Sequence, residues 1–288
     1  MAVTGIGESR LRRTLGALPR ATLPRPARRT REGLSEMMDG GIMSTREGEI
    51  FVREFALGHH SEHSRAFARR MIRACSAAGN AEEMPLGRQG AVWFDIETAG
   101  WLGRPMFLAG MIRRDGDDLV IKQFFARHWA EERALVAQVC EELRSASALF
   151  TFNGKSFDMP FVRDRAAYHR MNPPDCADHV DILHLARRKW RGVLPDCRLQ
   201  TLERHVCSRY RAGDVPSSEV PLRYHEYIHS GDPALIAPVF RHNMLDLVTL
   251  VEISAALPVH PDEVGIQGPS SRGRATPRAT LAERGGKK

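Results

Sequence analysis

The sequence predicts an α/β protein in which a mixed sheet is flanked by helices and preceded by a small N-terminal extension. Three strand-like segments follow one another between residues 91 and 125. The chain then alternates between short apolar strands and amphipathic helices up to residue 256, as expected for layered α/β folds. A length of 288 residues with 42% hydrophobic content is enough to bury a sizeable core.

Composition divides the chain into parts. The first 34 residues contain many Arg and Pro residues but no hydrophobic periodicity, and the last 31 are rich in Gly, Ser and Arg. Before the main domain, a strand is expected over 48–56 and a basic amphipathic helix over 64–78, and the apolar residues of that strand need burial. We therefore expect a disordered basic tail (1–34), an accessory segment packed on the core (35–87), the main domain (88–257) and a second disordered basic tail (258–288).

Each element of the main domain follows from its local pattern. Strands over 105–112 and 119–125 flank Asp115-Gly116-Asp117-Asp118, which has the composition of a hairpin turn. Residues 129–146 have apolar side chains at helical spacing and glutamates in the first turn. Similar arguments predict strands over 91–98, 148–152 and 180–183 and helices over 159–168, 185–190, 199–207, 222–230 and 233–256.

Charge and cysteine usage limit the environment and the partners. The net charge of +7 is concentrated in the two tails, which suits salt-sensitive contact with nucleic acid, although basic tails also increase solubility. Five scattered cysteines without a C-x-x-C pair favour a reducing compartment, so we expect a cytoplasmic protein. No uninterrupted apolar run approaches about 18 residues, so we expect no membrane contact.

Two acidic residues end the first strand of the main domain, Ala91-Val92-Trp93-Phe94-Asp95-Ile96-Glu97-Thr98. Strand side chains alternate, so Asp95 and Glu97 point to one side and Ile96 to the other. Two carboxylates on one face repel each other unless a cation lies between them, and a hard divalent metal is a suitable cation. A single Asp-x-Glu is more often a solvated strand end, so other acids must decide.

Two further acidic positions follow. Asp158 closes the segment Asn153-Gly154-Lys155-Ser156-Phe157-Asp158 at the start of a helix, where on its own it would be interpreted as a helix cap. His242 and Asp246 are four residues apart on an apolar helix and project from one face. Such a pair alone is usually a solvated face or a satisfied core pair. The presence of all three acidic positions in one chain favours a metal site.

These residues carry a resemblance to a known family. The order Asp-x-Glu, Asn-x-x-x-Phe-Asp and His-x-x-x-Asp resembles the DnaQ-like DEDD 3′–5′ exonuclease superfamily, which has a ribonuclease-H-like fold. Within that superfamily, residues 152–160, 181–188 and 242–247 are most similar to the YprB-type ribonuclease-H-like domain. The resemblance covers about residues 88–257.

The resemblance implies a 3′–5′ exonuclease that hydrolyses phosphodiester bonds of DNA or RNA by a two-metal mechanism. His242 would be the general base, for which an imidazole is suited. Its four-residue step to Asp246 departs from the family, because that spacing is typical of members with Tyr, whereas members with His usually have one residue more. Asp181 matches another recurring acid, with a structural or helix-capping role as the alternative. The implied ligands of two Mg²⁺ or Mn²⁺ ions are Asp95, Glu97, Asp158 and Asp246.

The implied partner is a single-stranded 3′ end of DNA or RNA. Basic and stacking side chains are candidates for its contacts, with Trp190 in the core as the alternative for the aromatic residue. Two other functions stay open: a catalytically weak nucleic-acid-binding module with the same fold, and a structure-selective endonuclease. The candidate nucleic-acid-binding residues are Asn153, Lys155, Arg187, Arg188 and Trp190.

Overall fold

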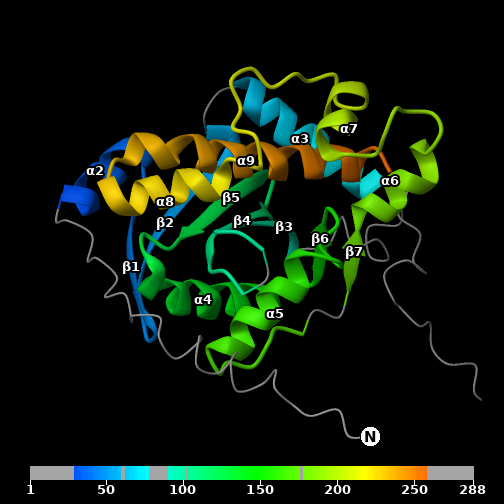
Figure 1. The fold of residues 1–288 in the computed structure, drawn as a ribbon. Coiled ribbons are helices and arrows are strands. Elements are labelled where there is room, and N and C mark those ends of the chain that lie inside the picture. The colour runs from blue at the N-terminus through cyan, green and yellow to red at the C-terminus, as the bar shows by residue number, and fades with distance from the viewer. Residues whose placement is uncertain (1–28, 60–61, 78–89, 102, 176–177, 258–288) are drawn as a thin grey trace, which may run out of the picture.

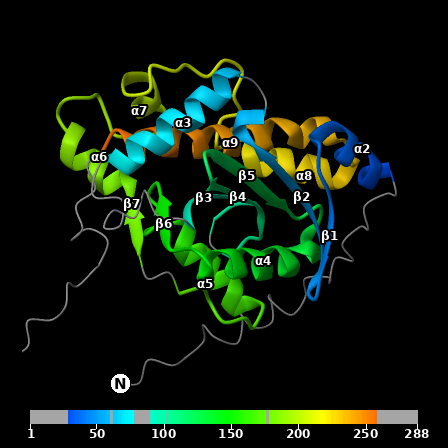
Figure 2. The same cartoon turned by 180° about the vertical axis from the view of Figure 1, so that it is seen from behind.

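The computed structural model describes residues 29–59, 62–77, 90–101, 103–175 and 178–257. These residues form a seven-stranded sheet between two layers of helices (Figures 1 and 2). Most of the N-terminal tail and all of the C-terminal tail expected from the sequence lie outside the described residues.

The sheet is mixed, as predicted. Its order is β1-β2-β5-β4-β3-β6-β7. The fifth strand in this order, β3, pairs with β4 in antiparallel orientation and with β6 in parallel orientation, so the antiparallel and parallel parts of the sheet meet there. The strands are β1 (Gly41–Thr45), β2 (Gly48–Ala56), β3 (Ala91–Thr98), β4 (Met106–Asp115), β5 (Asp118–Phe125), β6 (Ala148–Thr151) and β7 (His179–Asp181).

Helices cover both faces of the sheet. On one face lie α4 (Glu132–Arg144), which follows a 3-10 turn at Trp129–Glu131, and α5 (Asp158–Tyr168). On the other face the long helix α9 (Pro233–Ala255) runs across the sheet and contacts the five other helices of that layer (Figure 1). These neighbours are α2 (Arg29–Met38), α3 (Glu62–Ala77) after a 3-10 turn at Leu57–His59, α6 (Ile182–Trp190), α7 (Leu199–His205) and α8 (Val220–Ser230).

The alternation along β3 divides its side chains between these two faces. Phe94 and Ile96 pack into the cluster beneath α4 and α5. Trp93 packs into the opposite cluster and donates a hydrogen bond from Nε1 to Oγ of Ser254 on α9, at 3.1 Å. Asp95 and Glu97 are two and four residues after Trp93, so their side chains lie on the same face of the strand as Trp93 and extend toward the layer that contains α9.

The N-terminal residues extend the sheet. β2 pairs with β5, and β1, which the sequence analysis did not predict, pairs with β2. Ile50 and Phe51 are completely buried. α2 begins at Arg29, inside the stretch expected to be disordered, because Leu34 and Met38 pack into the cluster around Phe240. The division of the chain at residues 34, 87 and 257 stays a prediction.

One expectation needs correction. The strand predicted over 180–183 ends at Asp181, because the Asp181 side chain accepts a hydrogen bond from the Leu183 N–H and caps α6. A separate finding concerns α9. Among the described residues it is the one helix that is long and apolar enough, by length and composition, to cross a bilayer. Of the 18-residue apolar segment of this helix, 56% is buried inside the protein, as in a core helix.

Candidate active site

A cleft of about 560 Å³ opens at the C-terminal end of β3. Its wall is built by β3, the start of α5, the segment 217–221 and the middle of α9. All four predicted metal ligands line this cleft although they come from three separate parts of the chain. The predicted residues that line it are Asp95, Glu97, Asn153, Asp158, His242 and Asp246.

Hydrogen bonds from neighbouring elements hold the carboxylates of β3 and α5. Asn243 Nδ2 donates to Asp95 Oδ2 at 2.8 Å. Asp158 is the first residue of α5, is 4% exposed, and accepts a hydrogen bond from the Ile96 N–H at 3.2 Å. The start of α5 is therefore joined to the strand that carries the other two acids.

The cleft concentrates negative charge in a poorly solvated place. Burial raises the pKa of Asp95 and of Glu97 well above the usual carboxyl range, and repulsion from neighbouring carboxylates adds to both shifts. Burial also raises the pKa of Asp158 to about 7. The pKa of Asp246 is raised by burial, which outweighs the lowering effect of His242 and Arg211. Each carboxylate is therefore hard to ionise without a compensating cation.

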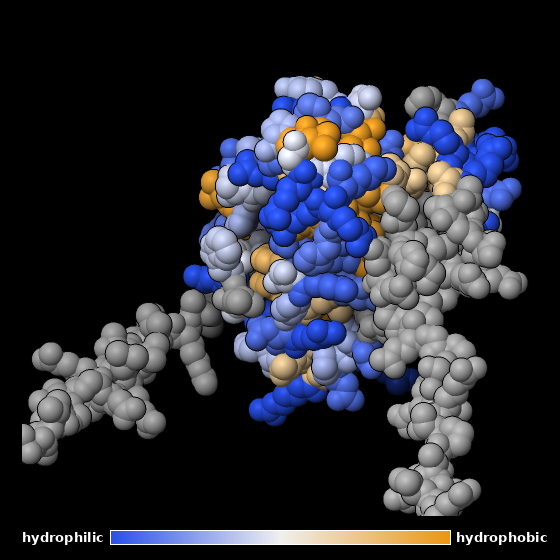
Figure 3. All heavy atoms as spheres, turned by 90° about the vertical axis from the view of Figure 1, so that its right-hand side faces the viewer, coloured by the Kyte–Doolittle hydropathy of each residue, from blue (hydrophilic) through white to orange (hydrophobic). Residues whose placement is uncertain are grey.

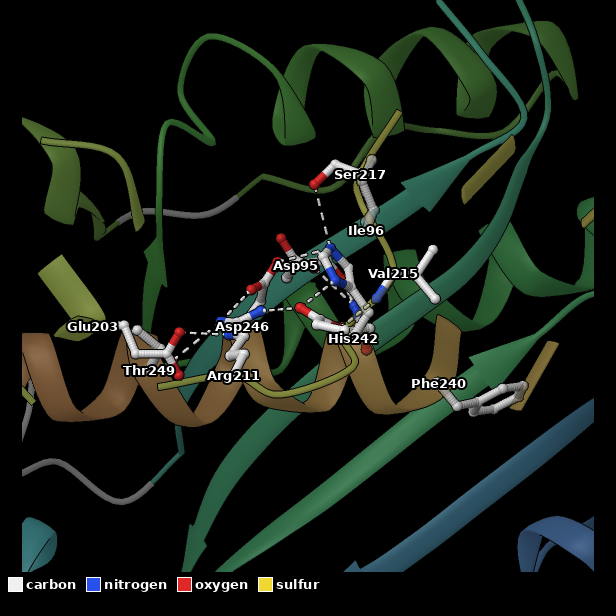
Figure 4. A network of polar contacts seen from close by, with 12 residues as sticks. Asp95, Ile96, Glu203, Arg211, Val215, Ser217, Phe240, His242, Asp246 and Thr249 are labelled. Carbon is white, nitrogen blue, oxygen red and sulfur yellow. Dashed lines mark hydrogen bonds and ion pairs between the residues drawn. The ribbon is translucent and has the colours of Figure 1, made fainter. Parts of the chain in front are cut away.

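His242 is 2% exposed and is held on both sides of its ring (Figure 4). Its Nδ1 lies 3.0 Å from Asp214 Oδ2, and Nε2 lies 3.4 Å from Ser217 Oγ and 3.5 Å from Asp246 Oδ2. Burial acts to raise the pKa of Asp214, but hydrogen bonds from Arg211 and His242 outweigh it and lower that pKa. An ionised Asp214 can only accept, so Nδ1 carries the proton and Nε2 is directed toward the cleft.

The segment 208–219, which we call the strap, supplies groups that the sequence analysis missed. Arg211 Nη2 lies 2.6 Å from Asp246 Oδ1, and Nη1 donates to Asp214 at 3.0 Å. Arg211 also contacts the buried Glu203 (Figure 4). The strap has no periodic pattern, so sequence reasoning had no signal that its polar residues would reach α9.

The donor set fits hard divalent cations. Carboxylate oxygens are their preferred ligands, and the four acids here lack enough positive charge nearby to offset their repulsion. In the arrangement described, however, Asp246 is paired with Arg211. Within the described ranges no three His, Cys, Asp or Glu side chains are already gathered in metal-binding geometry. Binding would therefore require side-chain adjustment.

The other predicted contact residues have different surroundings. Asp181 is 3% exposed and accepts from the N–H groups of Asn153 and Lys155, so it fixes the loop before α5 in addition to capping α6. Lys155 is exposed but does not line the cleft. Arg187, Arg188 and Trp190, on α6, do not line it either. The two arginines are exposed, whereas Trp190 packs against a core cluster. Helix α6 lies at the right-hand side of Figure 1, and the surface visible from that side is largely hydrophilic (Figure 3).

Two exposed aromatic side chains on the cleft wall were not predicted. Trp101 is 86% exposed, just after β3, and Phe157 is 37% exposed, just before Asp158. Because both rings line the cleft and are exposed, their faces are available for stacking on a flat ligand. Their neighbouring acids were recognised, but an isolated aromatic residue in a loop carries no sequence signal for exposure.

Sequence comparisons with known proteins agree with this architecture. The RNase_H superfamily model matches residues 92–257. The uncharacterized protein YprB of Bacillus subtilis (strain 168) is 32% identical over 166 residues, which cover 56% of this chain and 40% of that protein. The chain therefore spans less than half of the length of that relative. The family B DNA polymerase of Pyrobaculum calidifontis aligns over 58% of this chain and 24% of its own, with 15% identity and a TM-score of 0.46.

Proposed function

The chain belongs to the RNase H superfamily, and from this premise we propose that it is a metal-dependent 3′–5′ exonuclease acting on single-stranded ends of DNA or RNA. The observation that carries the proposal is the convergence of four carboxylates with raised pKa values on one cleft. Nucleases of this superfamily generally use divalent metals, so the proposal combines a known chemistry with a suitable donor set.

In the proposed reaction, water attacks phosphorus and the bond from phosphorus to the 3′-oxygen breaks, which releases a nucleoside 5′-monophosphate. Two Mg²⁺ or Mn²⁺ ions held by Asp95, Glu97, Asp158 and Asp246 would orient the water and stabilise the extra negative charge. His242 Nε2 accepts the proton of the attacking water, and Asp214 keeps Nδ1 protonated. The 3′-oxygen of the shortened strand takes a proton from solvent as it leaves, and the proton held on His242 Nε2 returns to solvent.

Trp101 and Phe157 support the choice of a single-stranded end. Unpaired bases offer flat faces that stack on exposed aromatic rings, at about 1–3 kcal/mol per base. Both rings lie on the wall that also carries the carboxylates, so a terminal nucleotide could stack while its phosphate faces the acids. The proposed substrate contacts are therefore Trp101, Phe157 and Asn153, with the exposed Lys155, two residues after Asn153, as a further phosphate contact.

The test uses single-stranded DNA and RNA labelled at either end, with Mg²⁺, Mn²⁺ or EDTA. We expect metal-dependent release of mononucleotides from the 3′ end, lost in an Asp95→Ala/Glu97→Ala variant. The same assay on circular single strands separates the reaction types, because an exonuclease needs an end. Cleavage of circles would replace the proposal with an endonuclease, and the preferred sugar would identify the substrate class.

A nucleic-acid-binding module with little activity is the second candidate. The observation in its favour is the ion pair between Arg211 and Asp246, which neutralises one of the four acids without a metal. This candidate predicts that Mn²⁺ does not raise the melting temperature, whereas the exonuclease predicts a rise that Asp158→Asn abolishes. Binding of a labelled oligonucleotide without hydrolysis, together with no thermal shift, would favour the module.

A further inference from the structure

A row of three residues crosses the sheet directly beneath α9. Asp95 on β3 is paired with Gly110 on β4, and Gly110 is paired with Gln123 on β5. Asn243 of α9 lies over this row and joins its two ends: it accepts from Gln123 Nε2 at 2.9 Å and donates to Asp95 Oδ2 at 2.8 Å. Both amide side chains are completely buried. Neither lines the cleft, so neither can touch a substrate bound there.

The direction of these hydrogen bonds is fixed at both ends. Gln123 Nε2 also donates to the main-chain oxygen of Phe240 at 2.9 Å, and a carbonyl oxygen can only accept. Gln123 must therefore present its NH₂ group, so Asn243 must present its oxygen to Gln123. At the other end, Asn243 Nδ2 faces two acceptors of Asp95, the carboxylate and, at 3.4 Å, the main-chain oxygen. A flipped amide would place acceptors against acceptors at either end.

This orientation leaves one group unsatisfied. Gln123 Oε1 is buried and has no hydrogen-bond partner among the described residues. A buried carbonyl without a partner is unfavourable, and an apolar side chain on β5 would avoid that cost. The donors of Gln123, rather than its acceptor, are what the arrangement uses.

The space for Asn243 exists because residue 110 is glycine. A Cβ atom there would lie 2.0 Å from Asn243 Oδ1 and 2.7 Å from a methyl group of Leu247. Any other residue would push Asn243 away from the sheet and so away from Asp95. One carboxylate oxygen, Asp95 Oδ2, is thus held by three features on three elements. They are the donors of Gln123, the missing side chain of Gly110 and the amide of Asn243.

We propose that Asn243, oriented by Gln123 over Gly110, is a positioning residue that holds Oδ2 of Asp95 in the interior and leaves Oδ1 free for the cleft. This inference rests on the proposed function, in which Asp95 binds a metal ion. Positioning groups behind metal ligands typically change metal affinity by about 10- to 100-fold. Gln123 acts only through Asn243, which makes the arrangement testable by the coupling of two substitutions.

The experiment measures Mn²⁺ affinity by titration calorimetry in the full chain. We expect Asn243→Ala to weaken Mn²⁺ binding by about tenfold or more. Ser254→Ala is the matched control, because Ser254 is also a buried residue of α9 bonded to β3, at Trp93, but does not touch Asp95. We expect this control to bind Mn²⁺ like the unaltered protein. Circular dichroism spectra establish that each variant is folded.

Gln123→Met gives a second, independent test. It should weaken Mn²⁺ binding in the unaltered protein but have no further effect when residue 243 is already Ala. Equal effects of Gln123→Met in both backgrounds, or unchanged affinity in Asn243→Ala, would overturn the inference while leaving the proposed function intact. Absence of Mn²⁺ binding in the unaltered protein would overturn both.

Discussion

Replacing Asp158 with Asn should make the metal-free protein more stable at neutral and alkaline pH. Asp158 is buried at the start of α5, among three other acids that face the same cleft. The substitution removes its charge but keeps a side-chain oxygen that can accept from the Ile96 N–H. A residue proposed to be essential for activity is therefore expected to lower the stability of the fold.

The pKa of Asp158 gives the size and the sign of the effect. It is about 7 in the folded protein against an ordinary 3.8, and a shift of about 3 units corresponds to about 4 kcal/mol. Because the folded state holds the proton more tightly, stability falls as pH rises from about 4 to about 7 and the full penalty applies above that. The buried amide of Asn offsets about 1–3 kcal/mol, so we expect a net gain of about 1–3 kcal/mol.

Urea denaturation at a series of pH values measures this directly. The free energy of unfolding of Asp158→Asn should lie about 1–3 kcal/mol below that of the unaltered protein near pH 4, where only the cost of the buried amide counts. It should then rise relative to the unaltered protein and exceed it by about 1–3 kcal/mol above about pH 7. Excess Mn²⁺ should stabilise the unaltered protein and not the variant. A difference that does not change with pH, or a variant that is less stable at alkaline pH, would show that Asp158 is not an unfavourably buried charge.

Three other predictions follow from the same contacts. Arg211→Gln should lower the free energy of unfolding by about 3–5 kcal/mol, because it removes the cation shared by Glu203, Asp214 and Asp246. The partly exposed Arg209, which also pairs with Glu203, is the control, and a loss no larger for Arg211→Gln than for Arg209→Gln would contradict this. Trp101→Ala should raise the KM for single-stranded oligonucleotides by about 5- to 100-fold, because it removes a stacking surface, with little change in melting temperature. Tyr168 is 69% exposed but lies outside the cleft, so Tyr168→Ala should leave KM unchanged. Burial and the charge of Lys155 lower the pKa of His179 to about 4. The stability that depends on its neutral ring is therefore present above about pH 6.5 and lost as pH falls toward 4. His179→Gln should flatten the free energy of unfolding between these pH values, and an unchanged slope would argue against a buried neutral ring.

The sequence was most informative where the chain is periodic. The strands β3 to β5, their hairpin and the long helix α9 could be predicted because alternation and the apolar stripe of a helix are local patterns. The acids of β3, α5 and α9 could be proposed together because each has a distinctive neighbourhood in the chain. Their meeting at one cleft depends on a sheet topology that the sequence only implied.

What the sequence could not predict depends on contacts between distant, irregular segments. Arg211 and Asp214 belong to a strap without periodicity, and only the packed structure brings them to Asp246 and His242. The basic residues of α6 are a different case: Arg187 and Arg188 do not line the cleft, so their contact with nucleic acid stays a prediction. A basic side chain on a helix surface has no local signal for its distance from a cleft, whereas the acids at a strand end and a helix start have backbone positions that predict their neighbourhood.

Gly110 shows how a site can depend on a position that has no functional group. It is buried in the middle of the sheet, and its effect on Asp95 is transmitted through the side chain that occupies the space above it. In a saturation mutagenesis experiment that separates abundance from activity, even Gly110→Ala should reduce activity more than abundance, although the residue lies outside the cleft. Such a position would be classified as structural by its location. In evolution, however, a larger residue could replace Gly110 only if residue 243 became smaller at the same time.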